Sequence, residues 1–165
     1  MQLGMVGLGR MGANLVRRLV RDGHTCGVYD VSPGAVTELA AESDAVTGAA
    51  DLDDFVAKLE APGAAWVMVP AAYAGETVAD IAGRMDAGDI VIDGGNTYYR
   101  DDIDRAEELA PKGIHYIDVG TSGGVFGLER GFCLMIGGED EPVNHLAPIF
   151  RTVAPGVGDV ERTPG

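Results

Sequence analysis

Short apolar runs alternate with amphipathic stretches along the chain. Six runs are apolar at nearly every position, which is typical of strands that are buried on both faces of a sheet. They span residues 2–7, 25–30, 64–70, 89–95, 113–120 and 131–138, and a weaker one lies at 45–47. Because parallel strands need a long crossover connection, the intervening stretches predict successive β-α-β units.

Helical periodicity marks the stretches between these runs. The predicted helices span residues 11–20, 51–59, 75–85, 101–109 and 140–150, and another begins at residue 32. There, Ser32 and Pro33 suit the N-cap and the first helical position. A last short strand is predicted near residues 157–160. The whole pattern predicts a doubly wound, Rossmann-type α/β fold, which is a largely parallel sheet with helices on both faces.

Length and composition narrow the class of protein. The chain has 165 residues, 46% of them apolar, which is enough for one domain with a sizeable core. No apolar run reaches the roughly 18 residues that span a bilayer. The first residues lack the basic region and the cleavage site of a signal peptide. We therefore expect a cytoplasmic protein with no membrane partner.

The chain is strongly acidic, with a formal net charge of −14 from 26 acidic and 12 basic residues. A nucleic-acid partner is not expected, because the neutralisation of phosphates requires a basic face. Any anion-binding site must therefore rely on backbone N–H groups or on a few well-placed arginines.

The two cysteines, Cys26 and Cys133, both lie in strand-like apolar runs. Without a secretory signal, they are predicted to be buried free thiols rather than a disulfide. The sequence contains no CxxC motif and no Cys/His cluster, so no metal site is predicted.

The loop after the first predicted strand has the spacing G-x-G-x-x-G and opens the first helix. It reads Gly7-Leu8-Gly9-Arg10-Met11-Gly12. In a dinucleotide site, these glycines allow a tight turn, the approach of the pyrophosphate and the close packing of helix and strand.

An acidic residue, Asp30, lies at the end of the second strand, 18 residues after Gly12. A carboxylate there binds the ribose hydroxyls and repels a 2′-phosphate, so the sequence predicts NAD rather than NADP. Two alternatives stay open. Asp30 could simply cap the turn at Ser32 and Pro33, and Arg10 could contact the adenine side or accommodate a 2′-phosphate.

Three further strand ends carry candidate ligand loops. After the fourth strand, Val69, Pro70 and Ala71 are predicted to pass beneath the nicotinamide, unless the proline simply ends the strand. After the fifth strand, Asn96 in the sequence DGGNT offers both a donor and an acceptor. After the sixth strand, the sequence GTSGG spans residues 120–124.

The last two loops suggest a second ligand, because a cofactor alone does not require both. Ser122, with the N–H groups of Gly123 and Gly124, can surround a carboxylate without adding positive charge. The alternative is that both loops are only helix-capping turns.

Three segments together resemble the 6-phosphogluconate dehydrogenase family. They read GLGRMG, DGGNTYYRD and GTSGGVFGLERGFCLMIGG. The resemblance covers essentially the whole chain, and Asp30 with GVFGLERG resembles the shorter, NAD-preferring branch. The commoner branch carries an Asn-Arg-Thr-like cluster for the 2′-phosphate of NADP, where this sequence has Asp30-Val31-Ser32.

The resemblance implies oxidative decarboxylation of 6-phosphogluconate to ribulose 5-phosphate, a step of the pentose phosphate pathway, with NAD as cofactor. It implies that Asn96 lies between cofactor and substrate. It also implies that Ser122, Gly123 and Gly124 hold the substrate near its carboxylate and C3 hydroxyl.

The family's base lysine and acid glutamate lie in a segment resembling GHFVKMVHNGIEY, which this sequence does not contain. Lys58 and Lys112 match no motif. We therefore expect residues 1–165 to be the cofactor-binding domain, which binds nucleotide but turns over little substrate without a helical second domain. That second domain forms the family's dimer, so the full-length protein is expected to be a homo-oligomer.

Two other readings compete. Another β-hydroxyacid dehydrogenase or an imine reductase would share the fold and the glycine loop, but not DGGNTYY or GVFGLERG. A non-enzymatic NAD-sensing domain would need Gly7 to Gly12 and Asp30, but not Asn96 or Ser122.

Overall fold

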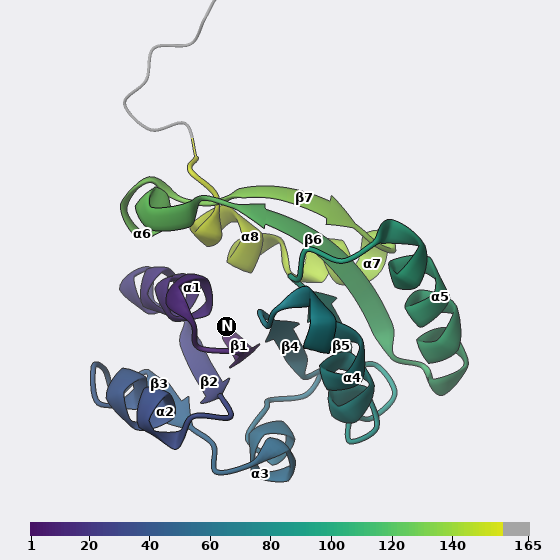
Figure 1. Ribbon diagram of the computed structural model, residues 1–165, viewed down its shortest axis with the longest axis horizontal. Coiled ribbons are helices and arrows are strands. Elements are labelled where there is room, and N and C mark those ends of the chain that lie inside the picture. Colours follow the sequence, from purple (N-terminus) through teal and green to yellow (C-terminus); the bar gives the residue numbers. More distant parts are fainter. Residues whose placement is uncertain (157–165) are drawn as a thin grey trace, which may run out of the picture.

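The computed structural model describes residues 1–156 and arranges them around one seven-stranded sheet (Figure 1). The strands are β1 (Gln2–Val6), β2 (Thr25–Tyr29), β3 (Val46–Gly48), β4 (Ala64–Val67), β5 (Ile90–Asp93), β6 (His115–Ser122) and β7 (Cys133–Gly137). Their order across the sheet is β3-β2-β1-β4-β5-β6-β7. All neighbours are parallel except β7, which runs antiparallel to β6. The predicted doubly wound, Rossmann-type fold is confirmed.

Helices cover both faces of the sheet. They are α1 (Arg10–Arg21), α2 (Pro33–Ala40), α3 (Leu52–Ala57), α4 (Ala71–Ala82), α5 (Tyr99–Leu109), α6 (Gly127–Arg130), α7 (Asp140–His145) and α8 (Ala147–Val153). The apolar sides of α1, α2 and α8 pack on one face, and those of α3, α4 and α5 pack on the other. Figure 1 shows α1 close to α8 and, across the molecule, α4 close to α5.

The continuous apolar runs of the sequence follow from this two-sided packing. In β4, Ala64 and Trp66 face the layer of α1 and α8, while Ala65 and Val67 face the layer of α3 and α4. Trp66 is fully buried and meets the ring of Phe150 edge-on at 5.9 Å between centroids. Every position of the strand is therefore a core position.

The helix boundaries differ most from the predicted ones in two helices, and the others shift by one or two residues at an end. The helix predicted at 75–85 begins at Ala71, because Pro70 occupies the N-cap and the alanines that follow favour helix. The helix predicted at 140–150 divides at Leu146, and Pro148 lies in the first turn of α8, where its missing N–H costs nothing. The strand predicted near 157–160 lies outside the described residues.

The two cysteines have different environments. Cys26 in β2 is 1% exposed, and burial raises the pKa of its thiol to about 12. Cys133, the first residue of β7, is exposed, and both thiols are free. The prediction of two buried thiols is wrong for Cys133, because β7 is an edge strand that pairs with β6 only.

This difference predicts selective alkylation. Iodoacetamide at pH 8 is expected to modify Cys133 in the native protein and to leave Cys26 unmodified, because only exposed thiolates react readily. Mass spectrometry of tryptic peptides measures the site. Cys26 should react only after denaturation, and its modification at the same rate as Cys133 in the native protein would contradict the buried position of β2.

Two further properties concern residues 1–156 as a group. None of their helices combines the length and the apolar character needed to cross a membrane. Their His, Cys, Asp and Glu side chains form no group of three or more that could hold a metal ion.

Candidate functional site

The glycine loop lies where the strand order reverses, between β1 and its neighbours β2 and β4. Ligands of open α/β sheets bind at this position, beyond the carboxyl ends of the strands. Gly7 has a φ of +93°, and its N–H donates to the carbonyl of Tyr29 at 3.0 Å. A Cβ on Gly12 would overlap the carbonyl oxygen of Gly7. The first and third glycines of the motif are thus required by the turn and by packing.

The second glycine leaves open space beside α1. A Cβ on Gly9 would meet no protein atom within 4 Å, and Gly9 is the N-cap of α1. No side chain caps this helix, and its first turn holds no acidic residue. Arg10 is exposed at the first helical position, while Met11 packs against the core. Free N–H groups, a positive helix end and an arginine are together able to hold an anion.

Asp30 lies next to this loop and is bonded to it. Its Oδ2 accepts the N–H of Leu8 at 2.6 Å, and its Oδ1 accepts the N–H of Ser32 at 2.8 Å. The turn-capping alternative considered from the sequence therefore exists in the structure. It does not exclude a ribose contact, because each carboxylate oxygen has a second lone pair.

A cavity of about 220 Å³ adjoins Asp30. Its lining includes Gly7, Asp30, Val31, Leu52, Val69, Thr77 and Asp80. Three of these side chains are aliphatic, and Asp30 stands at the edge of the glycine loop, as expected for a pocket that takes an adenosine.

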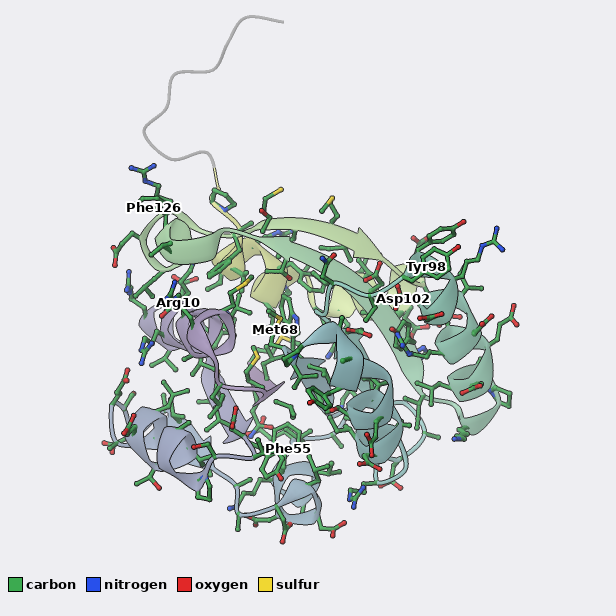
Figure 2. The ribbon with its side chains drawn as sticks, in the orientation of Figure 1. Arg10, Phe55, Met68, Tyr98, Asp102 and Phe126 are labelled. Carbon is green, nitrogen blue, oxygen red and sulfur yellow. The ribbon has the colours of Figure 1, made fainter. Side chains whose placement is uncertain are left out.

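The predicted ligand residues that follow β4 lie in two different places. Val69 lines the cavity beside Asp30. Pro70 and Ala71 are exposed and form the N-cap and first residue of α4. Met68 is half-buried, and its carbonyl oxygen would lie 2.6 Å from a Cβ on Gly7. In the view of Figure 2, Met68 lies between Arg10 on one side and Asp102 on the other.

Asn96 is exposed in the loop between β5 and α5. Its neighbours are held by carboxylates: Gly95 donates its N–H to Asp93 Oδ1 at 2.8 Å, and the Thr97 hydroxyl donates to Asp102 Oδ1 at 3.0 Å. A Cβ on Gly94 would collide with the side chains of Trp66 and Met68. The DGGN sequence is therefore also a packing motif.

Behind this loop lies a buried polar group that we call the Asp93–Asp102 cluster, made of Asp93, Asp102, Arg105 and Tyr116. The Tyr116 hydroxyl lies 3.0 Å from Asp93 Oδ2 and 2.9 Å from Asp102 Oδ1. Arg105 Nη1 lies 3.2 and 3.0 Å from the same two oxygens. Burial, followed by the charge of Asp93, raises the pKa of Tyr116 well above its usual range.

Asp118 adjoins this cluster on the neighbouring strand, where it pairs in register with Asp93. Burial raises the pKa of Asp118, with smaller contributions from the charges of Asp102 and Asp93. The sequence analysis missed Asp102, Arg105 and Tyr116. The three-residue spacing of Asp102 and Arg105 on one helix is a visible signal of an ion pair, but the link to Tyr116 is purely tertiary.

The second glycine-rich loop follows β6. The pairing of β6 with β5 ends at Asp118, whereas Ser122 still pairs with Cys133 of β7. Four residues of strand carry Ser122 roughly 13 Å beyond the end of β5. The paired strands β6 and β7 thus extend past the end of β5 and carry Ser122, which is exposed, beyond the carboxyl edge of the sheet.

Packing explains part of this loop's glycine content. A Cβ on Gly123 would lie 2.6 Å from the ring of Phe132, and one on Gly127 would collide with the same ring. Gly124 has a φ of +49°, and a Cβ on it would meet no protein atom within 4 Å, so the backbone at Gly124 has open space beside it. The residues that follow form a short helix, α6, which the sequence analysis did not predict.

A guanidinium holds α6 against α1. Arg18 donates to the carbonyl oxygens of Leu128 at 3.2 Å and Ala154 at 3.1 Å, and twice to that of Thr152. The helix that begins at the glycine loop is therefore tied to the helix that follows the Ser122 loop. Because β1, β4, β5 and β6 are parallel, the structure brings all four predicted loops to the carboxyl edge of the sheet.

Comparisons with known proteins agree with this geometry. A family model described as the NAD binding domain of 6-phosphogluconate dehydrogenase matches residues 2–160. The NAD(+)-dependent, decarboxylating 6-phosphogluconate dehydrogenase of Haloferax volcanii is 42% identical over 158 residues, which cover 94% of this chain and 51% of that protein.

Solved structures of dehydrogenases have the same fold as this chain. The 6-phosphogluconate dehydrogenase of Plasmodium falciparum, known in apo form and in complex with NADP+ and with 6-phosphogluconate, matches with a TM-score of 0.87 at 26% identity, covering 96% of this chain and 35% of that chain. A 3-hydroxyisobutyrate dehydrogenase of Salmonella typhimurium matches with a TM-score of 0.82 at 27% identity, covering 100% of this chain and 57% of that one. The chain thus spans about half the length of its Haloferax relative.

Proposed function

Because this chain belongs to the family of NAD-binding domains of 6-phosphogluconate dehydrogenase, we propose that it is the cofactor-binding part of an NAD-dependent, decarboxylating 6-phosphogluconate dehydrogenase. The observation that carries the proposal is the convergence of three loops at one sheet edge: the glycine loop with Asp30, the Asn96 loop and the Ser122 loop. A nucleotide site needs only the first of these. The other two support a second ligand beside the nicotinamide.

In the proposed reaction, C3 of 6-phosphogluconate loses a hydride to NAD, and its hydroxyl loses a proton to a base. The 3-keto acid then loses CO2, and the resulting enediol takes up a proton at its C1 and becomes ribulose 5-phosphate. Bound NAD would supply the hydride acceptor. The first turn of α1, including the N–H of Arg10, would hold the pyrophosphate, and Asp30 would hold the adenosine ribose. Asn96 would lie between cofactor and substrate, and Ser122 with the Gly123 and Gly124 N–H groups would hold the substrate carboxylate.

The choice of 6-phosphogluconate over another hydroxy acid depends on sequence and not on fold. The fold is shared with a 3-hydroxyisobutyrate dehydrogenase at nearly the same TM-score. The 42% identity with a relative named for 6-phosphogluconate favours the sugar acid. Calorimetric titration of the NAD-saturated chain with 6-phosphogluconate and with 3-hydroxyisobutyrate tests this choice, and preferential binding of 3-hydroxyisobutyrate would reject it.

Cofactor preference gives the direct test of the nucleotide site. Asp30→Asn is expected to weaken NAD binding by about tenfold or more, because a hydrogen bond from ribose to a charged acceptor is lost. NADP binding should change less or improve, because repulsion of the 2′-phosphate is removed. Calorimetric titration with each nucleotide measures the ratio.

Asp44→Asn is the matched control, since it makes the same charge change at an exposed position of the turn after α2. It should leave both affinities unchanged. Tighter binding of NADP than of NAD by the wild-type chain would show that Arg10 or another group overrides Asp30.

A further inference from the structure

The Asp93–Asp102 cluster accepts hydrogen bonds from a single turn of the chain, the Asn96 loop. Asp93 is fully buried, and Asp102 is only 7% exposed. Carboxylates are rarely buried to this extent unless they are paired and hydrogen-bonded. Both Asp93 and Asp102 are paired and hydrogen-bonded, and each also accepts a hydrogen bond from a residue of the Asn96 loop.

The two holding bonds flank Asn96. On one side, the N–H of Gly95 donates to Asp93. On the other side, the hydroxyl of Thr97 donates to Asp102. Asn96 itself is exposed, and its side chain takes part in no hydrogen bond within residues 1–156. The chain is therefore fixed before and after Asn96, while the Asn96 amide remains available to a ligand.

The two anchors are in turn fixed to each other. Arg105 of α5 and Tyr116 of β6 each contact both carboxylates. Three elements, β5, α5 and β6, thereby converge on one rigid polar group. Tyr116 is buried and Arg105 is half-buried, so both carboxylates are held by side chains that lie outside the Asn96 loop.

We propose that Asp93 and Asp102 are positioning residues that hold Asn96, before any ligand arrives, where the nicotinamide end of the nucleotide binds. What Asn96 contacts rests on the proposed function, whereas the positioning itself does not. Order established in advance lowers the entropy cost that binding must meet. The benefit should appear in the binding of the nicotinamide half and not in the binding of the adenosine half.

Two variants disrupt the hydrogen bond between the Thr97 hydroxyl and Asp102. Thr97→Val removes only the hydroxyl, and Asp102→Asn removes the charge that pairs with Arg105. Asp101→Asn is the matched control, because Asp101 precedes Asp102 in the same helical turn and is exposed. Calorimetric titrations of all chains use NAD and ADP-ribose, which lacks the nicotinamide.

Thr97→Val and Asp102→Asn are each expected to weaken NAD binding about fivefold, equivalent to one lost hydrogen bond. ADP-ribose binding should stay unchanged within the error of the titration. Asp101→Asn should affect neither ligand. A parallel loss of NAD and ADP-ribose binding would indicate general destabilisation and overturn the proposal, as would unchanged NAD binding.

Hydrogen–deuterium exchange of the ligand-free chain gives a readout that does not depend on nucleotide. Peptides covering residues 94–98 should exchange faster in Thr97→Val and Asp102→Asn than in wild type or Asp101→Asn. Faster exchange in a chain that binds neither NAD nor ADP-ribose would refute the proposed function while the positioning role stands. Unaltered exchange at 94–98 would refute the positioning role whatever the nucleotides do.

Discussion

Gly12→Ala is expected to abolish NAD binding and to lower the free energy of unfolding by about 1–3 kcal/mol. A new Cβ would overlap the carbonyl oxygen of Gly7 and would lie 3.5 Å from the Cβ of Met68. The contact with Met68 is of ordinary van der Waals length, but the overlap with Gly7 must be relieved, and Gly12 is buried while Gly7 already holds a φ of +93°. The turn between β1 and α1 must therefore open. Urea unfolding and calorimetric titration measure the two losses.

Gly9→Ala is the matched control in the same loop. Gly9 has a φ of −60°, which alanine adopts readily, and a Cβ there meets no protein atom within 4 Å. Stability should therefore change by less than about 0.5 kcal/mol. NAD affinity should still fall, because the methyl group occupies the space that the pyrophosphate needs. Full NAD binding by Gly12→Ala, or equal destabilisation by both variants, would contradict this division of roles.

Phe132→Ala is expected to lower the free energy of unfolding by about 3–5 kcal/mol, the largest stability effect we predict. Phe132 is fully buried, and the two glycines at 123 and 127 lie against its ring. Loss of the ring leaves a cavity that these backbones cannot fill without moving the Ser122 loop. Urea unfolding at constant pH gives the magnitude.

Phe126→Ala makes the same chemical change a few residues away, where the ring is 63% exposed and stacks beneath the Arg130 guanidinium. Its effect should stay within about 0.5 kcal/mol. If both substitutions cost the same, Phe132 is not the support on which the loop rests.

Most of the sheet was predictable because burial on both faces leaves a local signature. β1, β2, β4 and β5 appear in the sequence as apolar runs, and each of these four strands lies inside its predicted range. β7 shows the limit of that signature. Its residues are as apolar as those of a central strand, yet Cys133 and Met135 are exposed, since neither the direction of a strand nor its place at an edge is written in its own composition.

The candidate site shows the same contrast between features that are local in sequence and features that depend on tertiary contacts. The glycine loop and Asp30 could be found because their chemistry depends on a short, fixed spacing along the chain. The partners of Asp93 could not, since Tyr116 reaches it only through the pairing of β5 with β6. Gly123 was assigned to a ligand or to a helix-capping turn, and its packing role could not be predicted, because Phe132 meets it only after β6 and β7 have paired.

Asp30 links cofactor choice to local folding, which matters for engineering. Its two oxygens accept the N–H groups of Leu8 and Ser32. A small or basic residue that admits a 2′-phosphate would leave both backbone donors without that acceptor, directly beside the glycine loop. A redesign toward NADP with such a residue would therefore need a second substitution that restores an acceptor. We expect single substitutions such as Asp30→Asn to weaken NAD binding, and tight NADP binding to require paired mutations.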